Sequence, residues 1–143
     1  METNTMTREQ YLALVQKGGG GKRRHDHLES NIQRQCVSWF RMQFPDKAKL
    51  LFAVPNGGAR SRAEAGIMMA EGVTAGVADL ILLEAHGGYG ALCIEMKTKK
   101  KSSKQSERQK KWAEIARRAG NKYIVVKSLE EFIKEVTNYL KMQ

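Results

Sequence analysis

Two short apolar runs joined by a glycine-rich turn constrain the fold more than any other part of the sequence. Residues 79–83 read DLILL, residues 91–96 read ALCIEM, and Gly-Gly-Tyr-Gly occupies positions 87–90 between them. Apolar runs of this length, bounded by glycine clusters, are typical of buried strands joined in a hairpin. The sequence therefore predicts that this segment forms two neighbouring strands inside the core.

Helical spacing of apolar residues, together with helix start and stop signals, places the other elements. Helices are expected over 26–43, from Ser61 to Gly72, around 112–119 and over 128–140, and further strands over 50–54 and 123–126. Ser61 and Ser128 each begin an expected capping box, which a glutamate completes three residues later. This order of elements predicts an α/β domain, in which helices flank a central mixed β-sheet.

The first 24 residues differ in character from the rest of the chain. Four glycines at 18–21 precede Lys-Arg-Arg, a composition typical of a flexible basic segment. Residues 25–143 are enough for one domain with its own core and too few for two. We therefore expect one folded domain, 25–143, that follows a flexible N-terminal segment, 1–24.

The charge balance restricts the partners. The chain has 25 Lys and Arg against 15 Asp and Glu, a formal net charge of +10. This excess favours a polyanion, with nucleic acid ahead of an acidic membrane, although a merely soluble or ribosome-associated basic protein has the same balance. No apolar run could span a bilayer and the N-terminal residues contain no apolar signal core, so we expect a cytoplasmic protein with no membrane partner. Cys36 and Cys93 are expected to be buried, unpaired thiols.

Asp79, Glu95 and Lys97 are the residues of the paired runs that can carry chemistry. Side chains alternate along a strand, so Glu95 and Lys97 point the same way, and strand pairing brings Asp79 close to them. Neighbouring carboxylates repel unless a cation lies between them, and Mg²⁺ prefers oxygen ligands. The cluster therefore favours metal-assisted hydrolysis of a phosphodiester. The alternatives are a solvated Glu-x-Lys strand edge and an Asp79 that caps the turn after Gly76.

Several motifs, in this order, resemble a known family. They are GVADLILL at 76–83, CIEMK at 93–97, Ser-x-x-Gln-x-x-Trp at 106–112 and AGNKYIVV at 119–126. Together they are similar to the VRR-NUC domain, the virus-type replication-repair nuclease branch of the PD-(D/E)XK superfamily. Short stand-alone members also have a PNGG segment followed by arginines, which here begins at Pro55. One position departs from the pattern: Ala78 replaces the usual proline before the catalytic aspartate, which changes backbone rigidity and removes no ligand.

The resemblance, which spans about 29–140, implies a restriction-endonuclease-like core and a Mg²⁺-dependent endodeoxyribonuclease in which Mn²⁺ substitutes. Asp79 and Glu95 correspond to metal ligands, completed by the main-chain carbonyl of Met96. Lys97 corresponds to the residue that orients or deprotonates the attacking water. The implied substrate is branched DNA, such as a flap or a Holliday junction in DNA repair. The implied assembly is a homodimer, whose two sites would cut symmetric strands of a four-way junction.

Glu29 and Gln109 correspond to the acidic residue of the family's first helix and to its helix glutamine. Glu29 borders the apolar stripe of its helix, which suits a second-metal or water-positioning role. With Asp26 it could instead form a capping pair. Gln109 lies one turn before Trp112 and can face the end of the sheet, and an ordinary solvated helix residue is the alternative.

Seven residues are candidates for contact with DNA: Asn56, Arg60, Arg62, Lys99, Lys100, Lys101 and Lys104. Guanidinium groups and glycine-flanked backbone N–H groups suit phosphate oxygens, and the lysine run begins at the proposed scissile site. The alternatives are a turn into a helix and a solvated loop. Two other functions compete with a DNA endonuclease: a non-catalytic nucleic-acid-binding module, and an RNA-directed nuclease, since nothing in the residues reads a 2′-hydroxyl.

Overall fold

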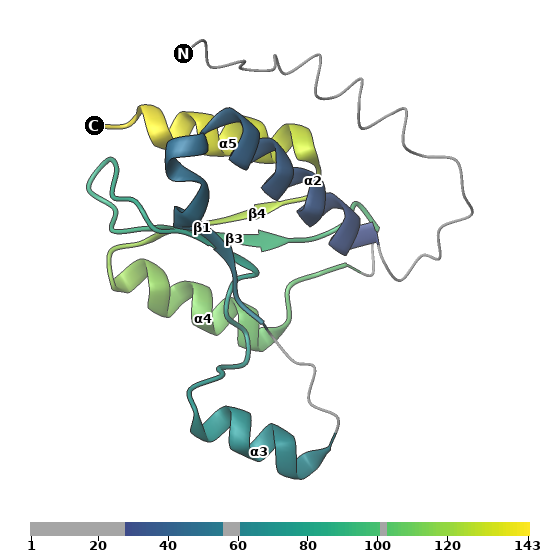
Figure 1. Cartoon of the computed structure of the whole chain (residues 1–143). Helices are drawn as coiled ribbons and strands as arrows, with labels where there is room; N and C mark the ends of the chain where they lie inside the picture. The colour runs from purple at the N-terminus through teal and green to yellow at the C-terminus, as the bar shows by residue number, and fades with distance from the viewer. Residues whose placement is uncertain (1–27, 56–60, 101–102) are drawn as a thin grey trace.

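The computed structural model describes residues 28–55, 61–100 and 103–143. Along the chain the elements are α2 (Leu28–Gln43), the 3₁₀ helix η2 (Pro45–Leu50), β1 (Leu51–Ala53), α3 (Arg62–Ala70), β2 (Leu80–Leu82), β3 (Leu92–Met96), α4 (Glu107–Arg118), β4 (Lys122–Val126) and α5 (Leu129–Lys141) (Figure 1). The N-terminal segment 1–24 and three proposed DNA contacts, Asn56, Arg60 and Lys101, lie outside the described residues.

The four strands form one mixed sheet in the order β1-β2-β3-β4. β1 pairs antiparallel with β2, β2 pairs antiparallel with β3, and β4 runs parallel to β3. Leu80 lies opposite Ile94, and Met96 lies beside Val126. The start of β2 and the ends of β3 and β4 therefore meet at the same end of the sheet.

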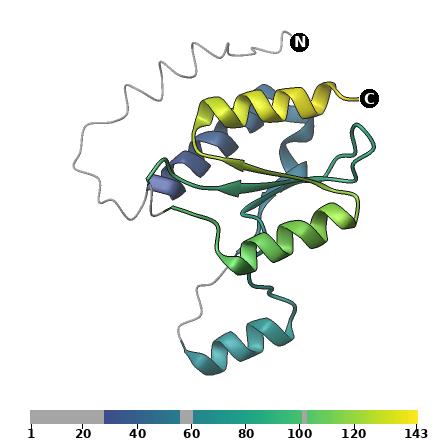
Figure 2. The ribbon, with the colours of Figure 1, turned by 180° about the vertical axis from the view of Figure 1, so that it is seen from behind.

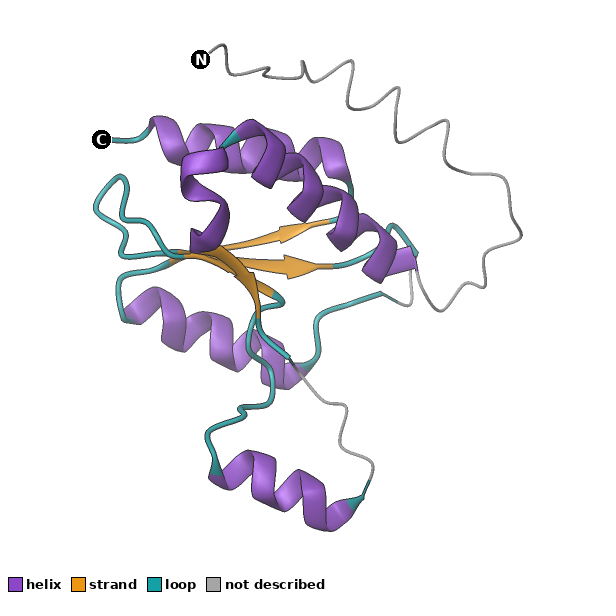
Figure 3. Ribbon diagram, viewed as in Figure 1, coloured by secondary structure: helices purple, strands orange, loops and turns teal. Residues whose placement is uncertain are grey.

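Helices cover both faces of this sheet. Figure 1 and the view from behind in Figure 2 show α2 and α5 side by side on one face and α4 on the other. The colouring by secondary structure in Figure 3 makes this three-layer arrangement plain and shows α3 set apart from the sheet. None of the described side chains of α3 is buried, in keeping with that position.

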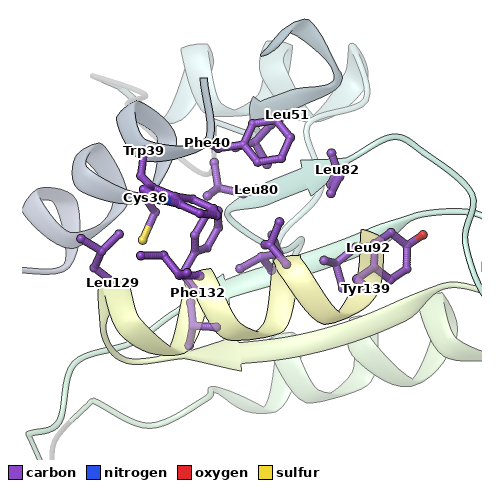
Figure 4. Close-up of a cluster of buried hydrophobic side chains, with 14 of the residues drawn as sticks. Cys36, Trp39, Phe40, Leu51, Leu80, Leu82, Leu92, Leu129, Phe132 and Tyr139 are labelled. Atoms are coloured by element: carbon purple, nitrogen blue, oxygen red, sulfur yellow. The ribbon is translucent and has the colours of Figure 1, made fainter. Parts of the chain in front are cut away.

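Strand alternation divides the core into two clusters. Leu92, Ile94 and Met96 of β3 point toward α2 and α5 and join the larger cluster, which Figure 4 shows around Trp39 and Phe132. The alternate residues face α4, so Cys93 joins a smaller cluster on that side. Glu95 is on the same face of β3 as Cys93 because side chains two apart share a face.

The expected α/β fold with a mixed sheet is confirmed, and each expected helix and strand has a counterpart. Two details differ. α2 ends at Gln43, and after Phe44 the unexpected helix η2 begins at Pro45, because proline suits the first turn of a helix. At α5, Ser128 caps the helix as expected, but the Glu131 carboxylate accepts from the N–H of Lys127 and does not complete a capping box.

The two cysteines match expectation. Cys36 and Cys93 are buried and unpaired, and burial raises the pKa of the Cys36 thiol to about 12 and that of Cys93 to about 11. Thiols with such a high pKa are poor nucleophiles. No helix in the described part of the chain is long and apolar enough to span a membrane.

Candidate active site

Asp79 lies at the end of the sheet where β2 begins, directly beside the end of β3. Its Oδ2 accepts a hydrogen bond of 2.7 Å from the backbone N–H of Met96. That bond crosses from one strand to its neighbour and fixes the direction of the carboxylate. The structure thus gives Asp79 a partner on β3 and places it next to Glu95.

Glu95 is the most deeply buried carboxylate of the site, with 1% of its surface exposed. Its Oε1 accepts from Gln109 Nε2 at 2.9 Å, and its Oε2 accepts from the Tyr123 hydroxyl at 3.3 Å. Burial raises the pKa of Glu95, and the neighbouring Asp79 carboxylate raises it further. An ionised Glu95 therefore depends on the positive charge and the hydrogen-bond donors around it.

Lys97 supplies positive charge at this end of the sheet. Its Nζ lies 3.7 Å from Glu95 Oε1, as expected for side chains two residues apart on one strand, and only 9% of the residue is exposed. An ammonium group with so little access to water needs nearby carboxylates. The structure brings Lys97, Asp79 and Glu95 into one patch.

Glu29 approaches the patch from α2, on the other side of the sheet. Burial raises the pKa of Glu29, the Lys97 ammonium lowers it and the Asp79 carboxylate raises it. Glu29 is therefore within electrostatic reach of both residues. The rival capping pair with Asp26 involves a residue outside the described part of the chain.

Gln109 reaches the patch from the first turn of α4 and has two hydrogen-bonding roles. Its backbone N–H donates to the Ser106 hydroxyl, and its Oε1 accepts from the backbone N–H of Ser106, which completes a capping box. Its Nε2 remains to donate to Glu95. The cap therefore orients the side-chain amide so that the donor points at the buried carboxylate.

The position of α4 depends on Gly76. Gly76 has φ +87°, and a Cβ atom there would lie 2.5 Å from the carbonyl oxygen of Arg108. Only glycine allows the backbone before β2 to pack this closely against the first turn of α4. The short motif that begins at Gly76 thus positions Gln109 as well as Asp79.

Comparison with known proteins supports the family that the motifs indicated. No family model matches the chain, and no curated protein matches it. A solved structure described as a "VRR_NUC domain protein" is 26% identical, covers 80% of this chain and 89% of its own, and superposes with a TM-score of 0.69. The chain contains a VRR-NUC domain. It is therefore a nuclease-type domain, with the α/β nuclease-like core that the resemblance implied.

The oxygen donors of this VRR-NUC domain fit a hard divalent cation. Asp79 and Glu95 place two carboxylates together, and Met96, whose main-chain carbonyl is the third expected oxygen donor, directly follows Glu95. In the described residues no group of three or more His, Cys, Asp or Glu side chains could hold a metal. Glu29 accordingly does not complete a three-carboxylate set. Two carboxylates suit Mg²⁺, which commonly keeps several water ligands.

The described basic residues of the VRR-NUC domain lie on two segments. Lys99, Lys100 and Lys104 are exposed on the segment that leads from Lys97 to α4, and Arg62 is exposed at the start of α3. Ser103 orders part of the first segment, because its hydroxyl accepts from the backbone N–H of Thr98 at 2.9 Å. The lysines thus follow directly from the carboxylate patch.

Sequence reasoning missed two residues of the site, Tyr123 and Gln105. Tyr123 was expected only as part of a buried strand, yet its hydroxyl contacts Glu95, and Gln105 Nε2 donates to that hydroxyl at 3.0 Å. A tyrosine in a buried strand needs a partner for its hydroxyl, which was an available signal. The identity of the partner depends on the register of β4 beside β3, and the sequence does not reveal that register.

Proposed function

We propose that this VRR-NUC domain is a Mg²⁺-dependent DNA endonuclease, with Mn²⁺ able to substitute. The observation that carries the proposal is the convergence of Asp79, Glu95 and Lys97 at one end of the sheet, with Glu95 almost fully buried. Holding two carboxylates together, one of them out of water, is unfavourable, and structural needs alone do not explain it. Sites that tolerate such an arrangement are commonly catalytic.

The family resemblance supplies a role for each residue, and the surroundings of the residue suit that role. Asp79 and Glu95, with the Met96 carbonyl, hold the cation, which when bound supplies positive charge to the phosphodiester. Lys97 orients or deprotonates the attacking water and offsets the charge that develops on the phosphate. Gln109 keeps the Glu95 carboxylate in place through the bond to Oε1. Glu29, within electrostatic reach of Lys97, orients water or contributes to a second metal site.

The exposed basic residues support a nucleic-acid substrate. Glu29 borders a hollow of about 650 Å³ along α2, and Gln109 borders another of about 570 Å³ between α3 and α4. Asp79, Glu95 and Lys97 line neither hollow, so the case for a nucleic-acid substrate rests on the basic residues. Lys99, Lys100, Lys104 and Arg62 are suited to contact the sugar–phosphate backbone. Branched DNA as the preferred substrate and a homodimeric assembly rest on the family resemblance.

Cleavage by matched variants tests the proposal. Asp79→Ala, Glu95→Ala and Lys97→Ala should each lose nearly all Mg²⁺-dependent cleavage of labelled DNA while remaining folded and able to bind it. Glu107→Ala is the matched control, because Glu107 is an exposed carboxylate on the first turn of α4. Full activity in Glu95→Ala would overturn the nuclease assignment. Binding without any Mg²⁺-dependent cleavage by the wild type would favour the non-catalytic module.

The substrate and the assembly need a separate measurement. A panel of duplex, flap, fork, four-way junction, single-stranded DNA and RNA, tested with the same preparation, should show branched DNA cut fastest. Light scattering on the free protein should give about twice the chain mass. Preferential cleavage of RNA would redirect the proposal, and a monomer that nicks only flaps would refute paired cutting of four-way junctions.

A further inference from the structure

Glu95 has a second hydrogen-bond donor, Tyr123, which the proposed chemistry leaves unused. We propose that Tyr123, held by Gln105, is a positioning residue that fixes the Glu95 carboxylate for metal-dependent cleavage. This inference rests on the function proposed above and adds two residues to it. Neither residue is placed in contact with the substrate, so both would act through Glu95.

The hydrogen bonds define the direction of the hydroxyl proton. Gln105 Nε2 donates to the Tyr123 oxygen at 3.0 Å, so the single hydroxyl proton is free to point at Glu95 Oε2, 3.3 Å away. That second distance is longer than usual for an O–H···O bond, so the bond contributes more to orientation than to stability. The two hydrogen bonds thus have the same direction: Gln105 donates to Tyr123, and Tyr123 donates to Glu95.

Packing keeps the ring of Tyr123 from turning away. The ring lies 6.1 Å from that of Trp112, centroid to centroid, and the Arg117 guanidinium lies 5.2 Å from its centre. β4 is paired with β3 so that Tyr123 lies beside Cys93, two residues before Glu95 and on the same face. The hydroxyl therefore reaches the carboxylate from a fixed point on the neighbouring strand.

The two oxygens of Glu95 have different donors. Gln109 binds Oε1 and Tyr123 binds Oε2, from α4 and β4 respectively. The terminal torsion of a glutamate is soft, so one donor leaves the carboxyl plane free to turn about that contact. Two donors from different elements fix the plane. Loss of the Tyr123 hydroxyl should therefore weaken metal binding and turnover without changing the DNA-binding surface.

The test removes one oxygen atom. Tyr123→Phe keeps the ring and should lower kcat roughly 10-fold to 100-fold, the usual range for residues that orient a metal ligand. The KM for DNA should stay unchanged, and a higher Mg²⁺ concentration should be needed for half-maximal rate. Tyr139→Phe is the matched control, since that buried hydroxyl donates to the Glu84 carbonyl at 2.5 Å, beyond the opposite end of β2 from Asp79.

A readout without cleavage separates positioning from activity. Mg²⁺ should raise the thermal unfolding midpoint of the wild type and of Tyr139→Phe, and should raise that of Tyr123→Phe less. Gln105→Leu should reproduce part of the loss, and the double variant should lose no more than Tyr123→Phe alone, because the residues act in series.

Two results would overturn the inference. The first is a Tyr123→Phe variant with the kcat and Mg²⁺ dependence of the wild type. The second is losses in Tyr123→Phe and Gln105→Leu that multiply in the double variant. A wild type that neither cleaves DNA nor is stabilised by Mg²⁺ would instead overturn the proposed function, and this inference with it.

Discussion

At the scale of single residues, Glu95 is placed where it weakens the fold. A carboxylate with 1% exposure next to Asp79 loses its hydration and gains a repulsive neighbour. The partial remedy is local: Gln109, Tyr123 and Lys97 all approach it. A residue selected for stability alone would carry no charge at this position. The buried charge therefore indicates a functional role for Glu95.

The first prediction follows from that conflict. In metal-free buffer with a chelator, Glu95→Gln should change the free energy of unfolding by no more than about 1 kcal/mol, because loss of the like charge beside Asp79 is offset by an amide N–H that faces one of the two donors, Gln109 or Tyr123. Cleavage should be lost, and Mg²⁺ should no longer raise the unfolding midpoint. Glu107→Gln, on the solvated face of α4, is the control and should change neither property. A Glu95→Gln variant that unfolds much more easily would show that the charge itself is structural.

At the scale of elements, α4 is fixed at its first turn by the loop that precedes β2. Gly76→Ala should displace that turn, since the new Cβ would lie 2.5 Å from the Arg108 carbonyl oxygen. Gly120→Ala is matched to it, because Gly120 also has positive φ, +93°, but open space around it. We expect Gly76→Ala to be less stable than Gly120→Ala by roughly 1–3 kcal/mol in denaturant unfolding.

Cleavage distinguishes a displaced helix from general loss of stability. Well below its unfolding temperature, Gly76→Ala should still cut DNA more slowly than Gly120→Ala, because Gln109 is moved away from Glu95. Equal rates in the two variants would mean that the first turn of α4 adjusts without loss of that hydrogen bond.

A second contact between elements joins the β2–β3 turn to the end of α5. His86 Nε2 lies 2.8 Å from Glu84 Oε2, and His86 Nδ1 lies 2.8 Å from the Met142 carbonyl oxygen. Both ring nitrogens face acceptors, so the doubly protonated ring satisfies both. The Glu84 carboxylate and then the Met142 carbonyl raise the pKa of His86, and the hydrogen bond from Lys47 lowers the pKa of Glu84.

This contact should make stability depend on pH. The contribution of a raised histidine pKa is fully present below its ordinary value of 6.5 and is lost as pH rises through the folded value. The contribution of Glu84 is present above 4.5 and is lost on acidification. The difference in free energy of unfolding between wild type and His86→Gln should therefore be largest between about pH 4.5 and 6.5. A difference that grows above pH 7 would contradict this assignment.

The elements also show how far sequence reasoning extends. Apolar runs together with helix start and stop signals predicted every described α-helix and every strand of the sheet, but they did not predict η2. The strand alternation that pairs Glu95 with Lys97 was visible in the printed residues. The donors to Glu95 were less accessible. Gln109 was expected near the sheet end, but its capping box with Ser106 and its bond to Glu95 depend on how α4 packs against Gly76. Tyr123 depends on the parallel register of β4, a long-range pairing that local sequence does not encode.

At the scale of the whole molecule, charge is unevenly arranged around the sheet. The net charge of +10 gives general attraction to a polyanion. The carboxylate patch is an exception to that balance, and the lysines after Lys97 lie directly beside it in sequence. A phosphate backbone drawn to those lysines would therefore arrive next to Asp79 and Glu95, so the basic segment would guide the substrate as well as bind it.

The last prediction tests this arrangement through salt dependence. Each phosphate neutralised by a lysine releases counterions, so the logarithm of affinity should fall linearly with the logarithm of salt concentration. Replacing Lys99, Lys100 and Lys104 with glutamine should reduce the magnitude of that slope by about 2–3 on duplex DNA, and should weaken binding equally across sequences.

A charge-matched triple variant isolates position from net charge. Lys49, Lys134 and Lys141 are also exposed but lie on η2 and α5, away from the segment that follows β3. Their replacement with glutamine removes the same three charges and should leave the slope nearly unchanged, because salt at 0.1 M screens the charge of an exposed lysine beyond about 10 Å. Fluorescence anisotropy from 50 to 300 mM salt, at a Ca²⁺ concentration chosen to prevent cleavage, measures both slopes. If the two triples behave alike, the basic segment after Lys97 is not the path of the DNA, and Arg62 on α3 becomes the next residue to replace.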